Sequence, residues 1–226
     1  YLYASGGARV EGAELTATLI YASGFEKVEG PVTLSPLDNG TYEINGQTFD
    51  KVILSCGAWL GQTLEPLGFD VDVRPQKGQL RDYFFEGMDT GRLPVLMPEG
   101  ELDLIPFAGG KISVGASHEN DQGFDLTVDE TVLASLEEEA KTYFPDLSTA
   151  KSFSERVGTR AYTSDFSPFF GEVPELEGVF VASGLGSSGL TTGPLIGKNL
   201  VELAMNRPGS LDSADYPVAQ YVKKKD

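Results

Sequence analysis

Residues 179–197 read VFVASGLGSSGLTTGPLIG and decide the fold, because an apolar run leads into a glycine-rich turn and then into a helix. The run at 179–183 has the length and composition of a buried strand. Proline suits the first position of a helix, since its φ is fixed and its missing amide needs no partner. The spacing therefore predicts a helix from Pro194 to about Met205.

The glycines of this turn, Gly184, Gly186 and Gly189, satisfy the dinucleotide-binding pattern G-x-G-x-x-G. Two features argue against the full fingerprint: the helix begins late, and no second strand that ends in an acid follows it. Three interpretations remain open, namely a true fingerprint, a strand-to-helix turn pressed against another ligand, and an incidental glycine loop. We favour the second. Free amides and the positive end of a helix dipole would face that ligand, which suits an anion or a ring that becomes anionic.

A second strand-to-turn unit lies earlier in the chain. Residues 51–55 predict a buried strand that runs into Cys56-Gly57-Ala58-Trp59, although taken alone this is more simply a core strand that ends in a turn. Between the two units, apolar runs predict strands at 79–85, 94–97, 102–106 and 111–116. We therefore expect an α/β (α+β) fold, in which both ends of the chain form one part and a mainly antiparallel β domain is inserted between them.

Other elements are predicted from local signals. Apolar spacing over 10–22 indicates a helix that Gly24 ends, and Thr127 with Glu130 forms a capping box for a helix that Pro145 closes. The pair Asn45-Gly46 between alternating runs predicts a β-hairpin. Short β signals also appear at 25–28 and 32–34, and the polar tail after Arg207 is expected to be loose.

The composition excludes several classes of function. A formal charge of −17 repels nucleic-acid phosphates and anionic lipid, so neither is an expected partner. One cysteine, Cys56, and one histidine, His118, are too few for a His/Cys metal site or a disulfide framework. No apolar stretch approaches the roughly 20 residues of a membrane span, and no export leader opens the sequence, so we expect a cytoplasmic location.

Two polar residues are candidates for chemistry. Arg160 lies among small and aromatic residues, and a guanidinium can hold a carboxylate in bidentate fashion, so it is a candidate substrate anchor. The alternative is a structural ion pair with Asp165 or Glu155. His118 follows a predicted strand, where a solvated turn histidine is expected rather than a catalytic base.

Three segments together resemble the D-amino-acid oxidase and glycine oxidase superfamily. Residues 53–59, ILSCGAW, are similar to its "AAGAW" strand end, and residues 74–79, RPQKGQ, to its "RPxRGQ" entry into the substrate domain. Residues 158–171 followed by 178–189 resemble "GLRPxTPDGxPxIG…GLYVATGHGRNG". Residues 7–11 are similar to the segment "GGARVDP". The order and spacing of these segments extend over essentially the whole chain.

The resemblance implies a flavin enzyme that oxidises a small amine or amino acid by hydride transfer to FAD. It implies a partial FAD-binding domain at residues 1–60 and 171–226 and a substrate-binding domain at 61–170. Arg160, matching the family's substrate arginine, would hold a carboxylate. The residues expected to contact a non-covalent flavin are Gly57, Trp59, Gly184, Gly186, Ser187, Gly189 and Leu190.

Two departures from the family pattern matter. The Gly-rich unit that binds the ADP half of FAD is not found, so we expect a fragment that purifies without FAD and is inactive by itself. Glycine oxidase relatives carry a second arginine where this chain has Ser187, which weakens the case for an ordinary amino-acid carboxylate. The rival interpretation is a non-catalytic module that binds a peptide or small acid, and either function is compatible with an oligomer.

Overall fold

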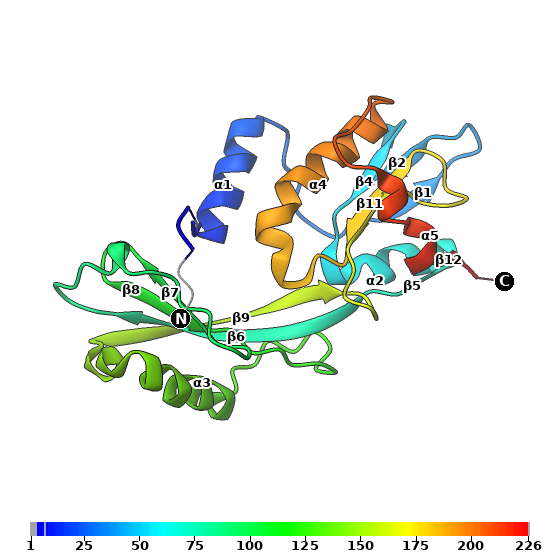
Figure 1. Ribbon diagram of the computed structural model, residues 1–226. Coiled ribbons are helices and arrows are strands. Elements are labelled where there is room, and N and C mark those ends of the chain that lie inside the picture. Colours follow the sequence, from blue (N-terminus) through cyan, green and yellow to red (C-terminus); the bar gives the residue numbers. More distant parts are fainter. Residues whose placement is uncertain (1–3, 7, 226) are drawn as a thin grey trace. The chain divides into compact units, whose positions relative to one another are not determined.

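The computed structural model describes residues 4–6 and 8–225, which divide into two units (Figure 1). The first unit takes the described residues up to Lys27, together with Lys77–Asn120 and Asp125–Gly158. The second takes Val28–Gln76, Asp121–Phe124 and the described residues from Thr159 onward. Each unit therefore combines segments that are far apart in the sequence.

The second unit is built on a three-stranded sheet of order β10-β11-β4. Strand β11 (Val179–Ser183) pairs in parallel with β4 (Val52–Leu54) and antiparallel with β10 (Phe169–Glu172). Helix α4 (Gly189–Ala204) packs on one face, where Ile196 and Leu200 meet Phe170 and Phe180 in a buried cluster. The parallel pair of strands and the helix packed on it give the α/β class that the sequence predicted.

The predicted hairpin forms in the same unit. Strands β2 (Tyr42–Ile44) and β3 (Gln47–Phe49) are antiparallel, with Ile44 opposite Gln47, and β1 (Leu34–Pro36) pairs with β2. Asn45 and Gly46 both have positive φ, 51° and 78°. A two-residue turn of this kind needs left-handed backbone at both positions, which Asn-Gly supplies at low cost.

The tail is ordered, contrary to the prediction that it is loose. Helix α5 (Val218–Tyr221) leads directly into β12 (Val222–Lys224), which pairs antiparallel with β5 (Phe69–Val71) beside helix α2 (Leu60–Leu64). Val218, Tyr221 and Val222 are buried in the main cluster of this unit. The prediction was wrong because three apolar side chains, spaced among polar ones, are enough to dock a short segment.

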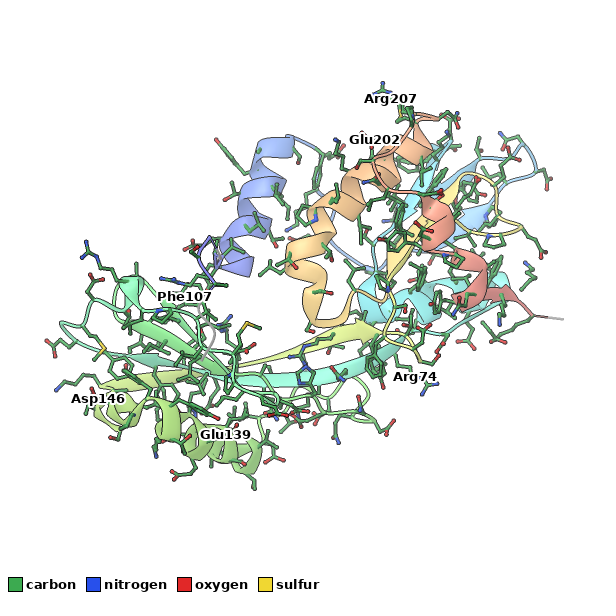
Figure 2. The ribbon with its side chains drawn as sticks, in the orientation of Figure 1. Arg74, Phe107, Glu139, Asp146, Glu202 and Arg207 are labelled. Atoms are coloured by element: carbon green, nitrogen blue, oxygen red, sulfur yellow. The ribbon has the colours of Figure 1, made fainter. Side chains whose placement is uncertain are left out.

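The first unit contains a four-stranded, mainly antiparallel sheet, of order β7-β8-β6-β9. Strands β6 (Arg74–Phe84) and β9 (Ser152–Tyr162) have 11 residues each, and β7 (Asp103–Phe107) and β8 (Lys111–Gly115) form a hairpin. Helix α3 (Glu130–Tyr143) covers one face, with Leu136 and Ala140 buried against Tyr83, Leu104 and Ile112. Glu139 lies on the side of α3 turned away from the sheet, and Phe107 at the end of β7 (Figure 2).

Some local predictions need correction. Helix α1 (Gly12–Ser23) ends at left-handed Gly24 as expected, but α3 is capped by Asp129, whose carboxylate accepts from the amides of Thr131 and Val132, and not by Thr127. No strand forms at 25–28, and 94–97 gives only the bridge Leu96–Leu104. Gly7, the first residue of the segment 7–11, lies outside the described residues. Short 3-10 helices complete the chain at Gly57–Trp59, Glu65–Leu67, Thr90–Arg92, Pro145–Thr149, Gly186–Ser188 and Ser213–Asp215.

The docked tail generates a stability prediction. Tyr221 stacks on Phe169 with ring centroids 4.9 Å apart, and its hydroxyl donates to Asp165 at 2.9 Å. Replacing Tyr221→Ala should lower the free energy of unfolding by about 3–5 kcal/mol, as for other buried aromatic truncations. Urea denaturation measures the effect, with exposed Lys223→Ala as the matched control. Equal stability of the two variants would show that the tail contributes nothing to the fold.

Candidate functional site

Both glycine-bearing turns lie at one edge of the second unit's sheet. Because β4 and β11 are parallel, with Leu54 opposite Val181, their carboxyl ends point the same way. Gly57 follows β4 and Gly184 follows β11, and the Ser183 hydroxyl donates to the Gly57 carbonyl at 3.1 Å. In open α/β sheets, ligands bind outside the carboxyl ends of the strands. The structure thus places the two predicted segments side by side at the expected edge.

The turn after β4 leaves space above its backbone. Gly57 has φ 56°, and a Cβ built on it would meet no atom within 4 Å. It opens the 3-10 helix Gly57–Trp59, and the Trp59 ring stacks on Phe124 at 4.7 Å between centroids while remaining 46% exposed. A half-exposed indole beside an open backbone turn is a surface on which a planar ligand can pack.

The glycines after β11 have different roles. Gly184, with φ 74°, is held by packing, since a Cβ there would lie 2.8 Å from the Ser167 carbonyl oxygen and 2.9 Å from Thr163 Cγ2. Gly186, with φ 53°, has nothing within 4 Å of the same position. Ser187 and Leu190 are exposed, and Gly189 is half-buried against Leu185. The turn therefore has one crowded side toward the protein and one open side.

Helix α4 begins earlier than predicted. It starts at Gly189, directly after the 3-10 helix Gly186–Ser188, and Pro194 lies inside it. The prediction from Pro194 was wrong because the glycine-rich turn is itself helical, and a proline in the second turn removes only one hydrogen bond. No side chain caps this amino end. Its first amides and the positive end of the dipole therefore remain available to a ligand over the turn.

Arg160 lies on β9, half-buried, and its strand ends next to the glycine turn. Thr163, fully buried just after β9, is the residue that crowds Gly184. The loop that follows is fixed by Asp165, which accepts hydrogen bonds from the Thr163 hydroxyl, the Ser167 amide and the Tyr221 hydroxyl. Desolvation would raise the pKa of Asp165, but these hydrogen bonds hold it below its usual value.

Of the two carboxylates considered as structural partners of Arg160, Glu155 binds Arg81 at 2.8 Å and Asp165 holds its own loop. The ordered loop connects β9 with β10 and keeps the end of the Arg160 strand against the glycine turn.

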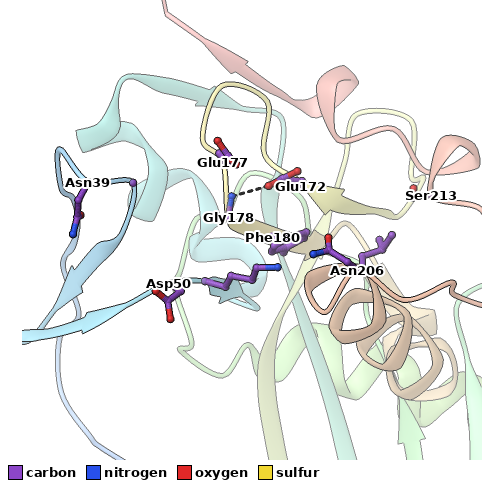
Figure 3. A pocket seen from close by; sticks show the side chains of 11 residues that line it. Asn39, Asp50, Glu172, Glu177, Gly178, Phe180, Asn206 and Ser213 are labelled. Atoms are coloured by element: carbon purple, nitrogen blue, oxygen red, sulfur yellow. Dashed lines mark hydrogen bonds between the residues drawn. The ribbon is translucent and has the colours of Figure 1, made fainter.

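A cavity of about 870 Å³ lies at the other end of the sheet (Figure 3). Asp50, Glu172 and Glu177 give its wall acidic character, and the Glu172 carboxylate accepts from the Gly178 amide at 2.6 Å. Lys51 donates to the Ala204 carbonyl at the carboxyl end of α4. This cavity adjoins the amino ends of β4 and β11 and negative helix carbonyls, so it is unsuited to an anionic ligand.

Within the described part of the chain, no group of three or more His, Cys, Asp or Glu residues is arranged to hold a metal ion. Among the same residues, no helix is long and apolar enough to span a bilayer. Sequence reasoning named His118 as a turn histidine but did not connect it with Glu101 and Asp103, which lie near it in the first unit. The signal of this group is weak in sequence, since the three residues are separated and only the β7–β8 hairpin brings them together.

Comparison with known proteins gives consistent matches. A family model described as "FAD dependent oxidoreductase" matches residues 2–203. The chain is 36% identical over 227 residues to the uncharacterized oxidoreductase YurR of Bacillus subtilis, covering 96% of this chain and 61% of that protein. It is 32% identical over 177 residues to glycine oxidase of Pseudomonas aeruginosa, covering 78% of this chain and 47% of that protein.

Solved structures give the same picture. Iminodiacetate oxidase from Chelativorans sp. BNC1 has a TM-score of 0.88 at 33% identity, over 93% of this chain and 59% of that one. Glycine oxidase from Geobacillus kaustophilus has a TM-score of 0.71 at 23% identity, over 84% and 51%, and bears on the fold alone. The chain therefore spans less than two thirds of each of these proteins.

The contrast between the two glycines is testable. Gly184→Ala should lower the free energy of unfolding by about 2–4 kcal/mol, because a left-handed φ and a clash with backbone act together. Gly186→Ala should lower the free energy of unfolding by only about 1 kcal/mol, because only the left-handed φ is unfavourable there. Chemical denaturation of both variants gives the comparison. A larger loss for Gly186→Ala would mean that the open side of the turn has been wrongly identified.

Proposed function

Because this chain belongs to the family of FAD-dependent oxidoreductases, we propose that the protein, once loaded with FAD, oxidises a small amine or amino acid at the carbon next to its nitrogen. The family prediction from the sequence segments is confirmed by the match over residues 2–203. FAD would supply the redox chemistry by accepting the hydride of that carbon. The protein's part is then to bind, orient and polarise, and the residues that do so are proposed below.

The observation that supports this function most directly is the open backbone at the carboxyl ends of two adjacent parallel strands. At Gly57 and Gly186 a Cβ would enter empty space, and both residues hold left-handed backbone. Glycine at such positions leaves room for a flat ligand to approach the main chain. Trp59, which is 46% exposed, lies in the 3-10 helix that begins at Gly57. These residues fit a flavin ring, with Ser187, Gly189 and Leu190 along its border.

The amino end of α4 gives the same turn an electrostatic role. Its uncapped amides would stabilise negative charge on a ring placed over Gly186 and Ser187. A fixed dipole of this kind needs no reorganisation when charge develops, which is how preorganised sites accelerate a reaction. Gly184 does not contact the ring in this arrangement, since its open direction is filled by Thr163 and Ser167, and it sets the path of the turn.

Arg160 is proposed as the anchor for a substrate carboxylate, with residues 61–170 as the substrate-binding domain and 1–60 with 171–226 as part of the cofactor-binding domain. The relatives named glycine oxidase and iminodiacetate oxidase act on small carboxylate-bearing amines, to judge by their names. A small amine that carries a carboxylate is therefore the proposed substrate class here. Bidentate hydrogen bonding from the half-buried guanidinium to the carboxylate would fix the orientation of the substrate.

The cofactor site predicts a specific effect of one side chain. Asparagine tolerates left-handed backbone, so Gly186→Asn should fold normally yet place a side chain where the ring would lie. We expect flavin bound per folded protein to fall at least about tenfold, a loss of roughly 1.4 kcal/mol in binding. Visible absorbance, measured after FAD equilibration of protein that carries this chain together with an ADP-binding unit, gives the flavin content. Gly197→Asn, on the open outer face of α4, is the control. Full flavin occupancy in Gly186→Asn would show that this turn does not contact the cofactor.

The activity itself is tested in flavin-loaded protein that carries this chain together with an ADP-binding unit. It is mixed anaerobically with glycine and with iminodiacetate, and the loss of oxidised-flavin absorbance is followed. Arg160→Ala should raise KM for these substrates roughly 30- to 150-fold, because a charge-assisted bidentate contact is worth about 2–3 kcal/mol. Arg160→Lys should raise KM less than Arg160→Ala does, and exposed Arg207→Ala should behave as wild type. No flavin reduction by any small amine would refute the function, whereas unchanged KM in Arg160→Ala would refute only the anchor.

A further inference from the structure

One aromatic residue of the second unit has a backbone conformation that is unfavourable for its side chain. Phe166 has φ 60°, in the left-handed region. A Cβ atom in that region lies too close to the following carbonyl oxygen, and a bulky residue there is an outlier. The family segment that residues 158–171 resemble has glycine at this position. The backbone of the loop therefore gives no reason for a phenylalanine.

Burial of the ring gives no reason for it either. Phe166 is 68% exposed, so only a small part of its apolar surface is removed from water. Within the described part of the chain its ring contact is with Tyr162, stacked with centroids 5.5 Å apart and an interplanar angle of 17°. Tyr162 is only 8% exposed. Most of the Phe166 ring therefore faces solvent, with a buried tyrosine as its support.

The loop that carries Phe166 is fixed on both sides of it. The Phe166 amide donates to the Thr163 carbonyl at 3.1 Å, which closes a tight turn. Asp165 accepts from the Ser167 amide at 3.1 Å and from the Tyr221 hydroxyl at 2.9 Å. A strained conformation persists only where its surroundings determine it, and such residues are concentrated at functional sites. These hydrogen bonds hold the backbone of Phe166 in the left-handed conformation.

The aromatic pair, Tyr162 and Phe166, lies next to Arg160. Ala161 packs against the main apolar cluster of the second unit. Because side chains alternate along a strand, Arg160 and Tyr162 share the opposite face of β9. Residues that are two apart on one face of a strand are separated by about 6–7 Å. A molecule whose carboxylate binds Arg160 can therefore reach the aromatic pair.

The same loop borders the glycine turn after β11. The Ser167 carbonyl oxygen and Thr163 Cγ2 fill the space beside Gly184, and Phe166 lies between these two residues in the chain. Arg160, the aromatic pair and the glycine turn all belong to the second unit. The aromatic pair is thus part of the same edge as the open backbone at Gly186.

We propose that the Phe166 ring, supported by Tyr162, is a platform for an aromatic substituent of the substrate. The substrate carboxylate would bind Arg160, and its ring would stack on the exposed ring of Phe166. Such stacking is worth roughly two- to tenfold in affinity beyond the effect of the buried area. This inference rests on the proposed function for the role of Arg160. It narrows the substrate class to carboxylate-bearing amines with an aromatic substituent.

Binding is measured without turnover by calorimetric titration. Flavin-loaded protein that carries this chain together with an ADP-binding unit is titrated with sodium phenylacetate and, separately, with sodium acetate. The two ligands share a carboxylate and differ by a phenyl group. We expect phenylacetate to bind at least about tenfold more tightly, because stacking and apolar burial act together. Equal affinities for the two ligands, or binding of neither, would overturn the proposal.

Phe166→Gly removes the ring and also relieves the backbone. It should weaken phenylacetate binding about tenfold and leave acetate binding unchanged. The urea midpoint should not fall, because loss of the unfavourable φ offsets loss of the ring contact. The matched control is Glu175→Gly. Glu175 is exposed and has φ 61°, and it lies in the turn between β10 and β11, at the other end of β11. Glu175→Gly should bind both ligands as wild type does.

Phe166→Asn is a second variant without the ring, since asparagine tolerates left-handed backbone. It should bind both ligands as Phe166→Gly does. An equal loss for phenylacetate and acetate in these variants, or no loss for either, would refute the platform.

The substrate class is tested by flavin reduction. Racemic phenylalanine should have a KM about tenfold below that of glycine, and Phe166→Asn should abolish this difference. Equal KM values in the unmodified protein would overturn the assignment of an aromatic substrate. Failure of any small amine to reduce the flavin would instead refute the proposed function, while the calorimetric titration still decides whether Phe166 binds a ring.

Discussion

The parallel pairing of β4 with β11 is the constraint on which the second unit depends. The two strands lie far apart in the sequence, and three register pairs bring them together. Parallel strands cannot be joined by a tight turn, so everything between them must be accommodated as a crossover or insertion. This one pairing places Gly57 beside the turn that begins at Gly184, and it aims the amino end of α4 at the same edge. Without it, the two glycine segments would be unrelated loops.

Glycine has two separate physical functions at this edge. At Gly184 the protein itself occupies the direction in which a side chain would point, so the absence of a side chain is required by packing. At Gly57 and Gly186 the space is empty, and the residue keeps backbone accessible. A sequence pattern of spaced glycines cannot distinguish these cases, because both need positive φ. Only the atoms around the position that a Cβ would occupy distinguish a glycine required for packing from one whose backbone can face a ligand.

Two local signals in the sequence were confirmed, whereas features that depend on tertiary contacts were missed. Asn45-Gly46 predicted its hairpin and the apolar run 179–183 its strand, because turn chemistry and burial act within a few residues. The long strand β9 was not predicted, since charged and small side chains interrupt its few large apolar residues and leave no regular apolar period. The order of the tail depends on burial of Val218, Tyr221 and Val222 against distant strands. The polar group at Asp103 likewise exists only after β7 and β8 pair.

The link from Tyr221 to Asp165 has a consequence for how the chain folds as it is synthesised. Asp165 orders the loop before β10, yet one of its donors and the strand that completes β5 come from residues 218–224. Contacts of such long sequence separation form late, because the intervening chain must first be made and closed. The second unit therefore cannot reach its final packing on the ribosome until residues 218–224 emerge. Until then, β5 presents an unpaired edge that a chaperone or another nascent chain can bind.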